Sequence, residues 1–196
     1  MVVHRLAAVN SRCISDKQLE TGDEKRETIF VKKLVYLSLG SNVGDRRANL
    51  EAAIERLGDV GEVKSVSSFY ETAPVEYTNQ PDFLNCAVEL ETEKMPKQFL
   101  AATQAIEFDL GRRRTAAGSG PRIKGPRTLD IDILIFGHAL VNTSGLTIPH
   151  PAMQERRFVL EPLAEIAPEL RHPVSKKTVR EMLHALPAGQ PVRKAK

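Results

Sequence analysis

The chain has 196 residues, of which 41% are hydrophobic and 27% are charged, and its net charge is +3. This composition is ordinary for a globular protein, and the length suits one well-cored domain better than two. No apolar run approaches the ~20 residues of a membrane-spanning helix, and the weakly basic start lacks the apolar block of a secretory signal. Two cysteines, Cys13 and Cys86, indicate neither a disulfide framework nor a thiolate metal site, so we expect a reducing cytoplasm.

The chain begins with a polar tail. Its stretch from Ser15 to Thr28 is polar, carries mixed charge and cannot bury much surface, so we expect residues 1–31 to form a disordered tail. Residues 32–190 are expected to form a single domain. Within it, alternating apolar residues over 33–39 predict a strand that enters a turn at Gly40-Ser41-Asn42.

Helical spacing and turn residues predict the next elements. Leu50, Ile54 and Leu57 recur at helical spacing behind Asp45, a candidate helix cap. The elements expected in this part are a helix from Asp45 to Leu57, strands over residues 63–70 and 83–90 joined by a proline-containing loop, and a helix from Pro96 to Gly111.

The second half of the chain adds a strand and two helical stretches. The strand covers residues 129–136, the first helical stretch contains Phe158 to Ile166, and Thr178 with Glu181 forms a capping box for a last helix. Strands and helices mix without regular βαβ alternation. The predicted class is therefore α+β, with helices packed on a largely antiparallel sheet.

The predicted strand over residues 129–136 contains two aspartates. Alternation places Asp130 and Asp132 on one face, roughly 6 to 7 Å apart, and predicts an apolar face made of Leu129, Ile131, Ile133 and Ile135. Like charges this close repel each other, so a positive partner is expected. Carboxylates are preferred ligands of magnesium, which leaves two interpretations of the strand: a metal site, or ion pairs with nearby arginines.

The loop before this strand is strongly basic. It carries no acidic residue between Gly111 and Thr128, and its basic residues are Arg112, Arg113, Arg114, Arg122, Lys124 and Arg127. Arginines grip phosphate oxygens in pairs of hydrogen bonds. A flexible arginine loop leading into two aspartates favours a polyphosphate site over a solvated charge run or a nucleic-acid patch.

Other residues offer a pocket for a planar ring. Asn85 shares a strand face with Phe83, and its amide could hydrogen-bond the edge of a pterin or purine. Phe83 and Phe158 could stack on such a ring, although core packing explains phenylalanines equally well. His150 lies between two prolines, in a rigid loop where it could contact phosphate or ribose. No known nucleotide-binding glycine motif is present.

Several blocks of sequence resemble the 6-hydroxymethyl-7,8-dihydropterin pyrophosphokinase family. They extend from about Leu34 to Ala185 and read YLSLGSNVGD, SSFYETAPVEYTNQPDFLN, IEFDLGRRR, GPRTLDIDILIFG and LTIPHPAMQERRFVLEPLAEIAPEL. The resemblance implies a ferredoxin-like α+β three-layer sandwich with helices on both faces of the sheet. It also implies transfer of pyrophosphate from ATP to the pterin hydroxymethyl group, with release of AMP, in folate biosynthesis.

The resemblance further assigns roles to individual residues. Asp130 and Asp132 would bind two magnesium ions, and Arg112 and Arg127 would act with them in catalysis by gripping the triphosphate. The residues that would line the nucleotide site are Gln104, Glu107, Arg114, Thr147, His150 and Arg156. The residues that would bind the pterin are Thr72, Val75, Phe83, Asn85 and Phe158.

This chain departs from some members of the family in its arginine loop. It has no tryptophan, and Lys124 stands where those members carry one that closes over the substrates. The loop is also about five residues longer than in the shortest members, by inspection. Lid closure and the separate arginine roles are the expectations that this difference affects most.

Two other classes of protein stay open at the level of sequence. A metal-dependent nucleotidyl or glycosyl transferase could use two aspartates but would release a different product. A ferredoxin-like RNA-binding module expects exposed strand aromatics, whereas this chain is only 5% aromatic. A catalytically silent relative is a further alternative. We expect small-molecule substrates, a monomer, and neither nucleic acid nor a membrane as partner.

Overall fold

The computed structural model describes residues 31–75, 78–111, 125–189 and 191–196. Its strands are β1 (Lys33–Ser41), β2 (Glu62–Val66), β3 (Tyr70–Thr72), β4 (Phe83–Thr92), β5 (Asp130–Phe136), β6 (Val141–Thr143), β7 (Leu146–Ile148) and β8 (Val192–Lys194). Its helices are α1 (Arg46–Leu57), α2 (Pro96–Asp109), the 3₁₀ turn η1 (Met153–Glu155), α3 (Arg157–Ile166) and α4 (Val179–Ala185).

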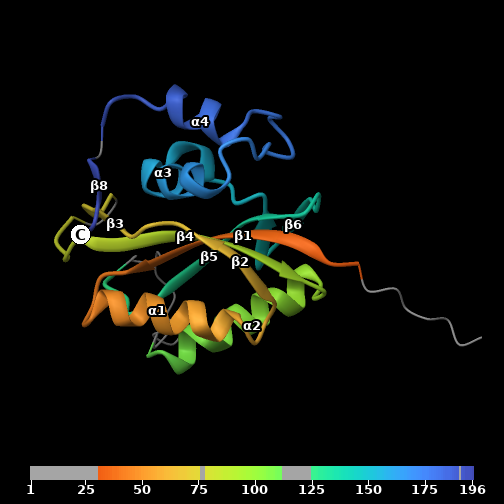
Figure 1. Ribbon diagram of the computed structural model, residues 1–196, viewed down its shortest axis with the longest axis horizontal. Coiled ribbons are helices and arrows are strands. Elements are labelled where there is room, and N and C mark those ends of the chain that lie inside the picture. The colour runs from red at the N-terminus through yellow and green to blue at the C-terminus, as the bar shows by residue number, and fades with distance from the viewer. Residues whose placement is uncertain (1–30, 76–77, 112–124, 190) are drawn as a thin grey trace, which may run out of the picture.

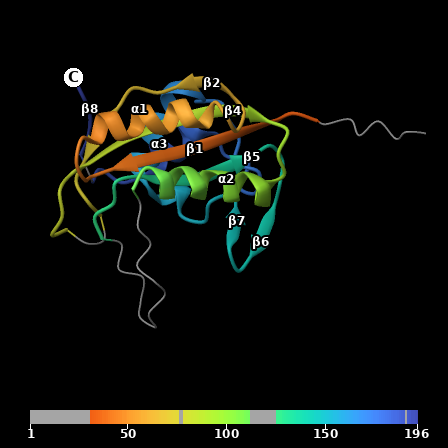
Figure 2. The same ribbon diagram turned by 90° about the horizontal axis from the view of Figure 1, so that it is seen from below.

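One antiparallel sheet forms the middle layer of the fold. Its strand order is β5-β1-β4-β3-β8, and β2 pairs with the far end of β4, on the edge that β3 also uses. Figure 1 shows α3 and α4 above the sheet and α1 and α2 below it, and Figure 2 shows α1 and α2 side by side across the lower face. This three-layer α+β arrangement confirms the predicted class.

Each face of the sheet has its own apolar core. The core under α1 and α2 is closed by Phe99 and Phe136, whose rings meet edge to face with centroids 5.6 Å apart. The core under α3 and α4 contains Leu134, Leu160 and Met182, all nearly inaccessible to solvent. Burying apolar side chains on both faces is the main force that holds the helices to the sheet.

The predicted helix starts are confirmed. The Asp45 carboxylate accepts the N–H of Ala48, and α1 ends where Gly58 follows Leu57. Thr178 and Glu181 form the predicted capping box at α4, because each side chain accepts the other residue's backbone N–H. Cys86 is a core residue as expected, and burial raises the pKa of its thiol to about 12.

The predicted apolar face of β5 is wrong at one position. The register of β1 and β5 shifts between Tyr36 and Leu37, so that Leu134 is an extra, bulged residue. Ile131 and Ile133 face α1 and α2, whereas Ile135 packs with Leu134 under α3 and α4. A strict alternation of side chains could not anticipate this shift, because both positions are apolar.

The strand predicted over residues 63–70 is interrupted. Its residues fall into β2 and β3, with a break over residues 67–69 that begins at Ser67. There the Ser67 hydroxyl, in place of a backbone carbonyl, accepts the N–H of Ala87, which locally disrupts the ladder. The hairpin of β6 and β7 and the strand β8 were not predicted, because each strand has only three residues and little alternation.

The predicted domain limits stay a prediction. The tail over residues 1–31 lies almost wholly outside the described residues. At the other end, β8 joins the sheet beyond the predicted limit at residue 190. None of the helices that the structure describes is long and apolar enough to cross a bilayer.

Candidate active site

Asp130 and Asp132 lie on the same sheet face as α3 and α4, which cover another part of that face. Asp130 is opposite Gly40, and Asp132 is opposite Ser38, so both carboxylates project on the same side of β5 as predicted. Their side chains are 21% and 35% exposed, respectively. The pair is therefore accessible from solvent and held on a rigid strand.

Arg127 holds the first aspartate from the entrance to β5. Its guanidinium forms a hydrogen-bonded ion pair with Asp130, and its Nε donates to the Gly125 carbonyl over 3.4 Å. The Arg127 backbone is fixed by Asn42 on both sides: its N–H donates to Asn42 Oδ1 over 2.8 Å, and its carbonyl accepts the Asn42 N–H. The positive partner expected for the aspartates is thus present.

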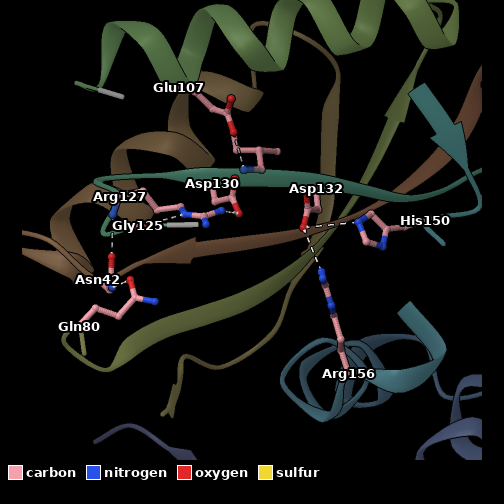
Figure 3. Close-up of polar contacts among 10 residues, drawn as sticks. Asn42, Gln80, Glu107, Gly125, Arg127, Asp130, Asp132, His150 and Arg156 are labelled. Carbon is pink, nitrogen blue, oxygen red and sulfur yellow. Dashed lines mark hydrogen bonds and ion pairs between the residues drawn. The ribbon is translucent and has the colours of Figure 1, made fainter. Parts of the chain in front are cut away.

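Asn42 was missed as a site residue. It is 2% exposed, and its amide nitrogen donates to Gln80 Oε1 and to the Pro81 carbonyl, as well as serving Arg127 through its oxygen. Figure 3 shows this residue joining the loop before β4 to the segment before β5. The signal in the sequence is a polar Asn at the end of a buried strand, a position that by itself predicts only a turn.

Asp132 faces two further basic side chains, a histidine and an arginine. Its Oδ2 lies 3.8 Å from His150 Nε2 and 3.9 Å from a terminal nitrogen of Arg156. The two side chains approach the carboxylate from different elements, the loop after β7 and the start of α3 (Figure 3). His150 Nδ1 accepts the N–H of Ala152, so a neutral ring carries its proton on Nε2, toward Asp132.

Backbone contacts fix the loop that carries His150. The His150 N–H donates to the Leu134 carbonyl at the bulge of β5, over 2.9 Å. Thr147 lies on β7, exposed, and pairs with Asn142 of β6. The short hairpin therefore brings His150, and not Thr147, into contact with the aspartate strand among the contacts that the structure describes.

Glu107 is a buried acid, only 3% exposed, on α2. Its Oε1 accepts the N–H of Ile131 over 2.8 Å, between the two aspartates of β5. Figure 3 shows Glu107 reaching β5 from the opposite side to Arg156. Gln104 lies one turn before it on α2 and is partly exposed. The carboxylate of Glu107 thus supports the aspartate strand directly.

The predicted pterin residues begin with a buried pair on β3 and β4. Asn85 Nδ2 donates to Thr72 Oγ1 over 2.8 Å, and the two residues are 4% and 3% exposed. Across the sheet, Asn85 is opposite Gly40, where a side-chain Cβ would come within 2.9 Å of the Asn85 amide oxygen. Only glycine leaves room for Asn85, because the clash would be with an amide already held by Thr72.

The remaining pterin residues surround this pair. Phe83 is partly buried on the same face of β4 and is opposite Thr72 on β3. Phe158 belongs to α3 and packs against the upper core. The Arg156 guanidinium lies over the Phe158 ring, 5.7 Å from the ring centroid. Val75 is 59% exposed in the loop after β3. Arg112 and Arg114 lie outside the described residues.

The carboxylates of the site form an open donor set for a metal ion. Across residues 31–75, 78–111, 125–189 and 191–196, no group of three or more His, Cys, Asp or Glu side chains could enclose a metal ion. Two partly exposed carboxylates remain, and magnesium commonly takes one or two protein carboxylates and fills its shell with phosphate and water. Asp130 and Asp132 fit such an open site better than a closed one.

Residues 36–168 match the family 7,8-dihydro-6-hydroxymethylpterin-pyrophosphokinase (HPPK). The chain belongs to the HPPK family. A Bacillus subtilis 2-amino-4-hydroxy-6-hydroxymethyldihydropteridine pyrophosphokinase is 45% identical over 142 residues, which cover 71% of this chain and 81% of that protein. The Pseudomonas aeruginosa protein of the same name is 41% identical over 155 residues, which cover 78% of this chain and 91% of that one.

Some HPPK relatives are much longer. The folic acid synthesis protein fol1 of Schizosaccharomyces pombe is 39% identical over 158 residues, which cover 80% of this chain but 21% of that protein. This chain therefore spans about a fifth of the length of that relative.

Solved HPPK-DHPS structures share the fold. One of them, determined in complex with substrates, has a TM-score of 0.62 at 17% identity and covers 79% of this chain and 43% of its own. A Plasmodium falciparum HPPK-DHPS with pterin and p-hydrobenzoate has a TM-score of 0.60 at 18% identity and covers 79% and 44%. At these identities the likeness concerns the fold, and it confirms the predicted ferredoxin-like α+β sandwich.

Proposed function

We propose that this chain transfers pyrophosphate from ATP to 6-hydroxymethyl-7,8-dihydropterin and releases AMP, the step of folate biosynthesis for which the HPPK family is named. The observation that carries the proposal is the grouping of Asp130 and Asp132 with Arg127, His150 and Arg156 on one sheet face. A carboxylate pair beside two arginines and a histidine suits a polyphosphate and its metal ions better than it suits a neutral substrate.

The two aspartates would hold two magnesium ions, with phosphate oxygens and water completing the coordination. When bound, magnesium neutralises charge on the phosphates and orients the attacking oxygen. The pterin hydroxymethyl oxygen would attack the β-phosphorus of ATP as the bond from that phosphorus to the α–β bridging oxygen breaks. AMP would leave with the bridging oxygen, and the hydroxyl proton would pass to solvent. Binding and electrostatics supply the acceleration, so no separate general base is assigned.

The cationic residues take complementary roles in this scheme. Arg127, next to Asp130, would contact the transferred phosphates together with Arg112 and Arg114 from the preceding loop. His150 and Arg156, which approach Asp132, would bind phosphate oxygens on the other side, and Gln104, Glu107 and Thr147 would line the nucleotide site. Arginine suits this task because it stays charged and donates in pairs.

The pterin would lie on the same sheet face, beyond the aspartates. The Thr72–Asn85 pair offers a fixed amide for the polar edge of the ring. Phe83 and Phe158 would stack on its two faces, with Val75 at the open side. The pairing of Asn85 with Gly40, itself opposite Asp130, aligns the pterin residues with the aspartates across three neighbouring strands.

The deciding experiment measures AMP release from ATP by purified protein, with and without the hydroxymethyldihydropterin and magnesium. AMP formation that requires both additions is the expected result. ADP or pyrophosphate as the product would keep the metal site and replace the reaction. Pterin binding without any turnover would identify a catalytically silent member of the family.

We propose in addition that the protein acts as a monomer in the cytoplasm, with small molecules alone as partners. The proposal of a reducing compartment rests on the sequence, whose two cysteines indicate no disulfide framework. Sedimentation of the purified protein would test the monomer, and a mass twice that of the 21.7 kDa chain would contradict it.

A further inference from the structure

Glu165, on the last turn of α3, connects three separate segments of the chain. Its carboxylate accepts from the Ser68 N–H over 3.0 Å, from the Ser68 hydroxyl over 2.8 Å and from the Tyr70 hydroxyl over 2.8 Å. The ammonium of Lys194, on β8, donates to the same carboxylate over 3.1 Å. One side chain thus joins a helix of the upper layer to β3 and to the edge strand β8.

The break between β2 and β3 makes this connection possible. Ser68 lies in the break and belongs to neither strand, so Glu165 can take its N–H without competing with a ladder hydrogen bond. Tyr70 starts β3, and its hydroxyl reaches up from the sheet to the helix. The strand β3 is therefore fixed to α3 at the point where pairing with β4 resumes.

The contacts of Glu165 flank the proposed pterin residues. Tyr70 is directly opposite Asn85 on β4, and Thr72, the partner of the Asn85 amide, lies two residues further along β3. Phe158 lies seven residues before Glu165 on α3, which is about two helical turns, so the two side chains share one side of the helix. Glu165 consequently links the helix that carries Phe158 to the strand that carries Thr72.

The strength of these contacts suits a positioning role. Burial alone would raise the pKa of Glu165, but the hydrogen bonds from Ser68, Tyr70 and Lys194 outweigh burial and lower the pKa below 4.5. Burial and the bond to Glu165 raise the pKa of Tyr70 to about 12, so its hydroxyl stays a donor. Because the Glu165 side chain is 31% exposed, we expect its hydrogen bonds to fix local geometry more than they stabilise the whole fold.

We propose that Glu165 is a positioning residue for the pterin-binding residues on α3, β3 and β4, and that Lys194 of β8 contributes by holding the Glu165 carboxylate. The carboxylate sets the separation between α3 and β3, and with it the position of Phe158 relative to the Thr72–Asn85 pair. This inference rests on the proposed function, because it takes the pterin to bind between those residues. It assigns a role in the reaction to a residue that would not touch either substrate.

The test compares kinetic constants for the two substrates in full-length variants. In Glu165→Gln we expect the KM for the hydroxymethyldihydropterin to rise by about tenfold, which corresponds to about 1.4 kcal/mol, with a parallel rise in its equilibrium Kd. The KM for ATP and kcat should stay within about twofold, because the aspartates and their arginines are held by other contacts. Glu165→Ala should show a larger rise, since it removes every acceptor at once.

A matched control comes from a neighbouring carboxylate. Glu169 forms an exposed ion pair with Arg180 over 2.9 Å, so Glu169→Gln makes the same chemical change without touching β3. It should leave all constants at wild-type values. If Glu165→Ala fails to fold, Tyr70→Phe and Lys194→Met each remove a single contact and should each raise the pterin constants alone.

The outcomes separate the inference from the proposed function. Wild-type protein that forms no AMP in the presence of pterin and magnesium would overturn the proposed function, and the inference with it. Wild-type turnover combined with unchanged pterin constants in Glu165→Gln would overturn the positioning role and leave the function standing. Equal losses for pterin and ATP would also overturn it, because they would indicate general destabilisation.

Discussion

The two aspartates of the site occupy different surroundings although they are two residues apart. Asp130 is engaged by Arg127 at the start of the same strand, whereas Asp132 meets His150 and Arg156 at 3.8 and 3.9 Å. The two carboxylates are thus contacted from three separate segments of the chain: the entrance to β5, the loop after β7 and the start of α3.

Removing either carboxylate should abolish most of the turnover. In Asp130→Ala and in Asp132→Ala we expect kcat to fall by a factor on the order of 100 to 1,000, because several kcal/mol of transition-state stabilisation are lost. AMP formation under saturating substrates measures this fall. Asp59→Ala, in an exposed pair with Arg56, serves as the control and should keep wild-type rates. Near wild-type rates in both site variants would contradict the metal assignment.

Asn42 offers a second test at the residue scale. Asn42→Ala removes the side-chain contacts to Arg127, Gln80 and Pro81 inside a buried region, so we expect the free energy of unfolding to fall by about 1–3 kcal/mol. The rate of AMP formation should also fall, since Arg127 loses one of its supports. Urea unfolding and initial rates measure the two effects, and the exposed Asn142→Ala is the comparison.

The site was predictable from sequence only in part. Asp130, Asp132 and Arg127 could be predicted because strand alternation and charge pattern place them close together. In the structure Arg127 pairs with Asp130, and His150 lies near Asp132. Asn42 was not predicted, because its hydrogen bonds join it to Gln80 and Arg127, which are 38 and 85 positions away in the sequence. No local sequence pattern indicates such distant contacts. Glu165 was missed for the same reason: its partners come from two distant strands.

At the scale of elements, the loop between α3 and α4 is built around a histidine. His172 is 5% exposed, and its Nδ1 accepts the N–H groups of Val174 and Ser175. Both bonds require a neutral nitrogen, since a protonated ring has no acceptor. Burial lowers the pKa of His172 below its ordinary 6.5, so the loop favours the uncharged ring.

This loop predicts a pH dependence of stability. Because the folded pKa lies below the unfolded value, the contribution of His172 is complete above about pH 6.5 and is lost as the pH falls toward the folded pKa. We expect the Tm to drop between about pH 7.5 and 5.5, and to drop less in His172→Asn. The exposed His138→Asn should behave as wild type, and an unchanged drop in His172→Asn would contradict the assignment.

The elements were predicted best where local chemistry defines their ends. Helices α1 and α4 begin at side-chain caps that are visible in the sequence, at Asp45 and Thr178. The strand β8 has no such mark: three residues, two of them basic, become a strand only because β3 offers an open edge. The bulge at Leu134 is likewise set by pairing with β1, which the sequence of β5 alone does not contain.

At the scale of the whole molecule, ligand binding should stabilise the fold only when magnesium is present. ATP with magnesium at about one hundred times its Kd should add about 2.7 kcal/mol of stability, seen as a rise in Tm. Excess EDTA should remove most of that rise, because the phosphates would then face Asp130 and Asp132 without an intervening cation. An equal rise with and without EDTA would argue against a metal site at these aspartates.

The sheet has two outer edges, and the strands there end in different ways. At one edge β8 is only three residues long and carries Arg193 and Lys194. At the other edge β5 is seven residues long and apolar, but Glu107 occupies the N–H of Ile131, and the backbone of His150 occupies the carbonyl of Leu134. Open apolar edges pair with other chains and lead to aggregation.

Glu107 and His150, which the family resemblance places beside the nucleotide, are thus also the groups that cover the edge of the aspartate strand. Selection against self-association would act on the same positions as selection for turnover. A substitution at Glu107 that uncovers β5 would therefore lower the soluble yield of the protein in cells. Part of its apparent loss of activity would then reflect a lower amount of soluble protein and not a lower activity per molecule.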